Sequence, residues 1–418
     1  MKKINFLIFI VWFLSIIISI LWTFENPEKI EKVKNYFKKK NIIEAKVSNE
    51  SLTEVTANSF NVNFSKVLEI SGKTAFVIHK NDKKFNTRSL EIYTQSGTLI
   101  KNLKSKRIKL PDHFTLQRNG GIKTIISFKG KRIALISSSK KDCFFASLVL
   151  LENNQELFRS KCLPEVPKNN DFNGLGSSNV HFQNSILFSL GTPEKHASKN
   201  SLLAQENNSN FGKILEIKKT DLEKKIASSN SDLNISIFSK GHRVPQGLTI
   251  LNGEIFSVEH GPKGGDELNK VKKGQNYGWP EVSYGTNYLK DGGGDGASYK
   301  INHEKNGFIE PLFAFLPSVG ISNLNNCPSV LKKYYKKNCL IALSLYGNNL
   351  RKGHSIIIFL LNEKSNKVDS IEKISLGELV LRHFITDENN LIFEDEIGNI
   401  YISADKKGIY KISFSKFR

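Results

Sequence analysis

The sequence is poor in cysteine and lacks any recognisable nucleic-acid-binding motif, and both absences narrow the classes of function that it can serve. Its four cysteines, Cys143, Cys162, Cys327 and Cys339, have neither the C-x-x-C spacing of a zinc site nor that of a redox motif. The formal net charge of +21 at pH 7 would favour nucleic acid if the basic residues were clustered. They are mostly scattered, and no zinc-finger, RNA-recognition or helix-turn-helix pattern accompanies the short lysine runs. We therefore expect a solvated basic surface and no nucleic-acid partner.

The cysteines fall into two couples that are local in the sequence. Two disulfides, Cys143 to Cys162 and Cys327 to Cys339, are the natural hypothesis for an exported protein. Four buried free thiols are the alternative, and the spacing alone leaves both open.

The N-terminal region also lacks something, namely small residues at the positions that a signal peptidase needs. Two lysines precede an almost wholly apolar run from Ile4 to Thr23, which is long enough to span a bilayer as a helix. Because no cleavage site follows, we expect an uncleaved signal anchor over residues 1–24 and a juxtamembrane helix and tether over residues 25–56. The lysines of residues 29–40 favour the opposite orientation by the positive-inside rule. The paired cysteines favour a membrane-anchored protein whose main part lies on the periplasmic or another extracytoplasmic face.

The remainder, residues 57–418, lacks any long stretch with a period of 3.6 residues. From about Phe60 onward, short apolar runs alternate with Gly, Asn and Asp at close spacing, and Leu391 to Phe414 reads as three strands joined by two glycine turns. About 350 residues of such hairpins fit six blades of four strands. The sequence therefore predicts an all-β protein, a six-bladed β-propeller that follows an N-terminal transmembrane helix. A polar segment from Thr192 to Asn210 is expected to be a long exposed loop.

Charged residues and glycines concentrate between Gly241 and Tyr284. Arg243, followed by Pro245 and Gly247, offers a fork of donors on a shaped turn, although an ordinary surface arginine is the alternative. The octet from His260 to Glu267 reads HGPKGGDE, and such a turn can direct backbone carbonyls and carboxylates toward a hard cation such as Ca²⁺. Taken alone, the octet is more typical of an ordinary glycine-rich turn with a helix or strand cap at Asp266. Trp279 is expected to be a packing residue.

Three ordered motifs in this region, GHRVPQGL, EHGPKGGDELN and GQNYGWPEVSYG, closely resemble the pyrroloquinoline quinone (PQQ)-dependent glucose/sorbosone dehydrogenase family, also called soluble aldose sugar dehydrogenases. The resemblance is clearest over residues 174–418. It implies a six-bladed propeller that oxidises an aldose at C1 to the lactone with PQQ and Ca²⁺ as cofactors. The sugar and the membrane are then the expected partners.

The resemblance also implies roles for individual residues. His181, in VHFQNSILFSLG, would be the general base, because the pKa of histidine lies close to neutral. Arg243 would polarise the quinone carbonyl, and Asp266 would orient the catalytic histidine or the site around it. Gln246, His260, Gly261, Pro262 and Arg382 would contact the cofactor, and the backbone carbonyls of Gly261 and Pro262 would ligate Ca²⁺.

Several positions depart from the family pattern. Gln183, Asn184 and Ser185 stand where the family has a run ending in arginine, and Val244 stands where asparagine is usual. The cations that hold the cofactor carboxylates map onto Tyr346 and Val380, and only Arg382 remains. These departures support an alternative function, a propeller that has lost its cofactor and binds a carbohydrate or a protein.

Overall fold

The computed structural model describes residues 43–48, 52–56, 60–80, 83–164, 170–194, 199–288, 294–345 and 354–416. The chain divides into two units, Met1–Ile43 and Glu44–Arg418, and all strands of the described residues belong to the second unit. The transmembrane segment expected at residues 1–24 lies outside the described residues, as does Tyr346. Within the described ranges, no helix is long and apolar enough to cross a membrane.

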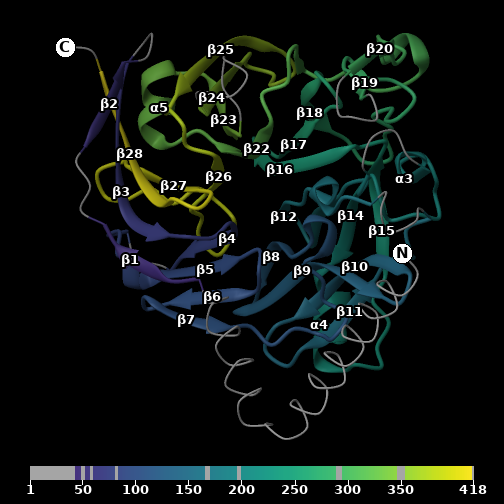
Figure 1. The fold of residues 1–418 in the computed structure, drawn as a ribbon. Helices are drawn as coiled ribbons and strands as arrows, with labels where there is room; N and C mark the ends of the chain where they lie inside the picture. Colours follow the sequence, from purple (N-terminus) through teal and green to yellow (C-terminus); the bar gives the residue numbers. More distant parts are fainter. Residues whose placement is uncertain are drawn as a thin grey trace, which may run out of the picture. The chain divides into compact units, whose positions relative to one another are not determined.

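Antiparallel sheets make up the larger unit, and six of them supply the four-stranded blades of a ring (Figure 1). The first three blades consist of β4 (Thr74–His79), β5 (Leu90–Thr94), β6 (Thr98–Lys101) and β7 (Lys104–Arg107); β8 (Ile122–Phe128), β9 (Lys131–Lys140), β10 (Cys143–Leu150) and β11 (Gln155–Arg159); and β12 (Asn179–Phe182), β13 (Ser185–Leu190), β14 (Lys213–Lys218) and β15 (Ile235–Lys240). The last three consist of β16 (Val244–Leu251), β17 (Glu254–His260), β18 (Asp266–Val271) and β21 (Phe313–Phe315); β22 (Ile321–Asn326), β23 (Asn338–Ser344), β24 (Ser355–Leu361) and β25 (Val368–Ser375); and β26 (Leu381–Phe384), β27 (Ile400–Ala404), β28 (Gly408–Lys416) and β3 (Phe60–Ile70). A separate hairpin pairs β19 (Thr286–Tyr288) with β20 (Gly294–Ser298).

Helices are few and short in the part of the chain that the structure describes. The α-helices are α3 (Lys199–Leu202), α4 (Lys219–Ala227) and α5 (Ser329–Tyr335), and the 3-10 turns are η1 (Thr87–Ser89), η2 (Gln117–Asn119), η4 (Phe172–Leu175) and η5 (Glu304–Asn306). This content agrees with the all-β architecture that the hairpin pattern predicts.

The first strand of each blade lies innermost and contacts the first strand of the next blade. Successive blades repeat the same path, so their inner strands all run from the same face of the ring to the other. These inner strands are β4, β8, β12, β16, β22 and β26. We call the side on which they begin the strand-start face, and the side on which they finish the strand-end face. The two faces present different loops, and this difference decides which residues meet.

The ring closes between the two ends of the larger unit, because β3 pairs antiparallel with β28. The register places Phe64 opposite Ile412, and Val62 opposite Phe414. This pairing removes the open edges that β28 and β3 would otherwise present. Apolar side chains fill the space between the blades, and strands such as β24 (SIIIFLL) are buried along almost their whole length.

The structure corrects two expectations about loops. The end of the range 25–56, expected as helix and tether, contains β1 (Ala45–Val47) and β2 (Thr53–Thr56), both paired with β3, while residues 25–42 and 49–51 lie outside the described residues. These strands are too short for their alternation to stand out in a lysine-rich segment. The loop expected to be exposed at Thr192–Asn210 is buried in part: Thr192, Glu194, Asn200 and Ala204 are buried, and Lys213 Nζ donates to Ala204 O at 2.9 Å.

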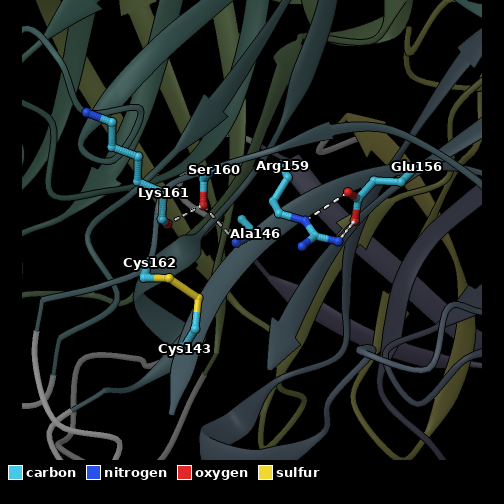
Figure 2. Close-up of a disulfide and its surroundings, with 7 residues drawn as sticks. All are labelled: Cys143, Ala146, Glu156, Arg159, Ser160, Lys161 and Cys162. Atoms are coloured by element: carbon cyan, nitrogen blue, oxygen red, sulfur yellow. Dashed lines mark hydrogen bonds and ion pairs between the residues drawn. A yellow bond between two sulfur atoms is a disulfide. The ribbon is translucent and has the colours of Figure 1, made fainter. Parts of the chain in front are cut away.

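All four cysteines are paired, as the exported-protein hypothesis predicts. Cys143 is bonded to Cys162, across a Cα–Cα distance of 5.2 Å, and ties β10 to the segment after β11 (Figure 2). Cys327 is bonded to Cys339, with the Cα atoms 5.4 Å apart, and ties the end of β22 to β23. The alternative of four free thiols is therefore wrong.

Candidate functional site

Arg243 is held in place on the strand-start face, immediately before β16. Its Nε donates to Glu194 Oε1 at 3.1 Å, and its Nη1 donates to the carbonyl oxygen of Gly261 at 2.5 Å. The guanidinium also lies 5.1 Å from the ring centroid of Trp279, a cation–π distance. Trp279 thus does more than pack. The side chain of Arg243 is 14% exposed, so the site presents a fixed cation at the surface of the ring.

Glu194 is the acidic partner of Arg243, and the sequence offered no pattern that singled it out. Its side chain is only 2% exposed, and its Oε2 has no hydrogen-bond partner among the described residues. Burial raises its pKa to about 7, against the opposing effect of Arg243. An acid in a polar segment was the only available signal, since contact with Arg243 is a tertiary feature.

Glu259 and His242 hold the backbone of Arg243 in place. Glu259 Oε2 accepts the backbone N–H of Arg243 at 2.7 Å, and its Oε1 lies 3.0 Å from Nδ1 of His242. The fully buried His242 also stacks on Tyr277, with the ring centroids 4.7 Å apart. These contacts fix the backbone from which Arg243 projects, so they position the arginine without touching a ligand.

Asp266 is a backbone clamp. Its Oδ2 accepts N–H groups of Val319, Gly320 and Ile321 at 3.0, 2.6 and 3.2 Å, and its Oδ1 accepts the N–H of Gly261 at 3.1 Å. The carboxylate therefore ties the glycine-rich turn to the start of β22. None of the hydrogen bonds of Asp266 within the described residues goes to His181, so its role in the site stays a prediction.

The turn itself needs glycine. A Cβ on Gly261 would lie 2.2 Å from the carbonyl oxygen of Gly265, and Gly265 has a φ of +71°. Neighbouring His260 points its Nε2 at the carbonyl oxygen of Ile321, 2.6 Å away, so this nitrogen carries the proton. Burial lowers the pKa of His260, and the ring is a neutral donor to the backbone.

One of the two calcium ligands predicted at this turn, the Gly261 carbonyl, is engaged elsewhere. The Gly261 carbonyl accepts from the guanidinium of Arg243, and a second cation at the same oxygen would be repelled. Among the residues that the structure describes, no group of three or more His, Cys, Asp or Glu side chains is arranged to hold a metal ion. In this arrangement the donor set does not fit Ca²⁺.

Gln246 and Arg382 line a different part of the strand-start face, a cavity of about 50 Å³ where inner strands begin. Arg382 makes a two-pronged ion pair with Asp405, and its Nε lies 3.1 Å from Asp405 Oδ1. Lys123, at the start of β8, lines the same cavity, although sequence reasoning did not select it. The cofactor contacts predicted at Arg243 and at Arg382 therefore belong to one face of the ring.

His181 lies elsewhere, toward the strand-end face. The N–H of Ser177 bonds to the carbonyl of Pro245, so Ser177 is level with the first residues of β16. His181 is four residues further along the inner strand, roughly 13 Å at the usual rise per residue. Its Nε2 lies 2.9 Å from the carbonyl oxygen of Ser127, and burial, with Lys219 nearby, lowers its pKa. The structure thus does not bring His181 and Arg243 together.

Comparison with known proteins gives the fold and the site a context. The family model described as Glucose / Sorbosone dehydrogenase matches residues 134–376, more than half of the chain. The aldose sugar dehydrogenase YliI of Escherichia coli is 27% identical over 175 residues, which are 38% of this chain and 43% of that protein. Quinoprotein glucose dehydrogenase B of Acinetobacter calcoaceticus is 32% identical over 127 residues, 29% of this chain and 25% of that protein. The chain thus matches less than half the length of these curated relatives.

A solved structure, the PQQ-bound aldose sugar dehydrogenase of Streptomyces coelicolor, superposes with a TM-score of 0.52 at 16% identity, over 87% of this chain and 98% of that one. At this identity the likeness shows the fold alone. The three motifs around Arg243 all lie inside the residues that the family model matches. The chain belongs to the glucose/sorbosone dehydrogenase family.

Proposed function

We propose that this protein is a PQQ-dependent dehydrogenase that oxidises an aldose at C1 to the lactone. The observation that carries the proposal is Arg243, which is held at the ring surface by Glu194, Gly261 and Trp279. A fixed, partly desolvated guanidinium suits the stabilisation of a developing oxyanion. Family membership and the quinoprotein relative support PQQ as the oxidant.

When bound, PQQ supplies the acceptor for the hydride that leaves the sugar carbon. The residues of this chain supply position and charge. Arg243 would bind the oxygen of the cofactor or substrate on which negative charge grows. Glu194 acts through Arg243, as a positioning residue, by fixing the plane of the guanidinium.

Calcium is the second cofactor proposed for the family site, and Gly261 and Pro262 are its candidate ligands. Since the Gly261 carbonyl is bonded to Arg243, we derive no step through calcium. Removal of metal by a chelator tests this point directly: activity that persists in the chelator would exclude a calcium requirement.

One observation favours the second candidate function, a propeller that binds a carbohydrate or a protein without redox chemistry. At the level of Pro245, the third blade presents Gly176 and Ser177, and His181 lies four residues away. The histidine expected to accept the proton is therefore displaced from the place where the enzyme hypothesis needs it.

We also propose an extracytoplasmic location, with a membrane anchor in the first 24 residues. The two disulfides support it, because such bonds persist mainly in oxidising compartments. The expected partners are then a sugar, the membrane and an electron acceptor.

The test is to purify the full chain, add PQQ with and without Ca²⁺, and follow dye reduction with a panel of aldoses. PQQ binding is measured separately by absorbance, and sugar binding by calorimetry. Turnover supports the enzyme. Sugar binding without PQQ binding or turnover supports the binding module and contradicts the enzyme.

Two variants sharpen the result. Arg243→Gln should lower kcat/KM about 100-fold or more, because it removes the oxyanion partner. Arg159→Gln, which removes an exposed arginine of β11, is the matched control and should leave kcat/KM unchanged. His181→Ala should change kcat/KM by less than about threefold, given its place toward the strand-end face. Loss of nearly all turnover in His181→Ala would instead restore this histidine as the base.

A further inference from the structure

The cavity at the strand-start face has an unusual charge balance. Its lining includes two cations, Lys123 and Arg382, beside the polar side chains of Gln95, Gln246 and His383, and no acidic residue of the described ranges lines it. Burial and the neighbouring Arg382 lower the pKa of His383 to about 3, so this ring is neutral and adds no charge. The cavity is therefore positive and polar.

Lys123 is the less well balanced of the two cations. It is 9% exposed, and its Nζ donates to the carbonyl oxygen of Asn119 at 2.8 Å. Within the described ranges it makes no ion pair. The charge of Asp171 favours the protonated form of Lys123. The Asp171 carboxylate already accepts hydrogen bonds from the backbone N–H of Asn173 and from the side chain of Asn119.

Arg382, in contrast, has a counter-ion in Asp405. Lys123, Arg382 and Asp405 together carry one positive charge beside the cavity, and Asp171 is a further acid whose charge acts on Lys123. A buried ammonium group whose described hydrogen bond goes to a neutral carbonyl is poorly solvated, and a bound anion would relieve this.

We propose that this cavity is an anion-binding pocket that receives one carboxylate group of a ligand lying over the mouth of the ring, with Lys123 and Arg382 as its cations. The cavity measures about 50 Å³, several times the roughly 10–15 Å³ needed to hold one water molecule, so a carboxylate group has room there. Gln95 and Gln246 supply amide N–H donors. The pocket deepens the proposed function, on which it rests only for the identity of the ligand: in that function the carboxylate belongs to PQQ.

The pocket should bind anions more weakly as the pH rises. Burial, Arg382 and Lys73 lower the pKa of Lys123 to about 7, while Asp171 acts in the opposite direction. An anion favours the charged lysine, so binding takes up a proton above pH 7. His383, whose pKa is lowered to about 3, is already neutral below this range.

The experiment measures thermal stabilisation of the full chain by oxalate, a small dicarboxylate, at constant ionic strength against chloride. Wild type should be stabilised, and its apparent affinity for oxalate should be about tenfold or more weaker at pH 8.5 than at pH 6. Lys123→Met should lose at least about 90% of this affinity. Lys131→Met removes an exposed lysine of the same blade that does not line the cavity, and it should behave as wild type.

Titration with PQQ separates the two proposals. Oxalate binding that depends on Lys123, without any PQQ binding, supports the pocket and contradicts the proposed cofactor. An oxalate response that is absent in wild type, or equal in Lys123→Met and wild type, overturns the pocket whatever PQQ does. Because Lys123→Met removes a buried charge, it should fold at least as well as wild type, and its melting temperature without ligand checks this.

Discussion

At the scale of single residues, the site contains buried carboxylates that need hydrogen-bond donors from the backbone or from an arginine. Glu194 and Asp266 differ in how many donors they have. Asp266 is surrounded by four backbone N–H groups, while Glu194 has one oxygen on Arg243 and one oxygen without a partner in the described part of the chain. A carboxylate with full hydrogen bonding is a structural anchor, whereas a half-satisfied one responds to pH.

Glu194 should make the protein less stable as the pH rises. Its pKa is about 7 in the folded protein, against an ordinary value of 4.5, so the folded chain binds more protons than the unfolded chain between these values. Stability is then fully present below pH 4.5 and falls by up to about 3 kcal/mol as the pH rises through 7. Glu194→Gln should remove this loss in urea unfolding at pH 5 and pH 7.5. Glu206→Gln, at an exposed acid of the same loop, should keep the wild-type dependence.

Asp266→Asn should weaken the clamp strongly. In the variant, the amide NH2 group would face backbone N–H groups that donate to the carboxylate in the wild type, so these hydrogen bonds would be lost. Each lost hydrogen bond to a charged group costs about 1.5–3 kcal/mol. We expect a loss of about 3 kcal/mol or more in the free energy of unfolding, measured by urea titration. Asp112→Asn, at an exposed loop position, should stay within about 0.5 kcal/mol of wild type. A loss below about 1 kcal/mol at Asp266 would contradict the clamp.

At the scale of elements, the local cross-links carry stability that the short strands lack. The disulfide between Cys143 and Cys162 (Figure 2) has a sequence separation of 19. The loop that it closes contains β11, an edge strand of its blade. In the chain-entropy account, a loop of this size contributes about 3 kcal/mol.

The double variant Cys143→Ser/Cys162→Ser should therefore lose about 3 kcal/mol in the free energy of unfolding. The pair Cys327→Ser/Cys339→Ser should lose a similar amount, because its loop spans 12 residues. Wild type treated with dithiothreitol should move toward the melting temperature of the combined variant. Equal stability of wild type and both double variants would show that neither cross-link matters.

At the scale of the whole molecule, ring closure depends on β3. Its residues Val62 and Leu68 are fully buried, and its pairing with β28 joins residues that are more than 300 positions apart. The strands β1 and β2 pair with β3, on its far side from β28.

A chain limited to residues 44–418 should unfold cooperatively near the melting temperature of the full chain. A chain limited to residues 71–418 lacks β3, leaves the edge of β28 open, and should aggregate or melt without cooperativity. Calorimetry and size-exclusion chromatography check both results. A monodisperse, cooperatively melting 71–418 chain would show that β3 is dispensable.

Much of this protein was determined by local sequence. Hairpin spacing predicted six blades, because each blade is built from neighbouring strands, and the motifs around Arg243 and Asp266 identified one wall of the site. Cysteine proximity along the chain predicted both disulfides for the same reason.

Only the tertiary structure decided which residues meet across blades. A few positions along an inner strand separate the two faces of the ring. His181 therefore lies in a segment that resembles the family's histidine-bearing strand, yet it is roughly 13 Å beyond the level of Arg243. Glu194 is identified by its contact with Arg243, and Lys123 by its place in the lining of the cavity at the strand-start face. Both depend on residues of other blades. Burial and charge pairing at such contacts depend on the closed ring, and no stretch of sequence contains them.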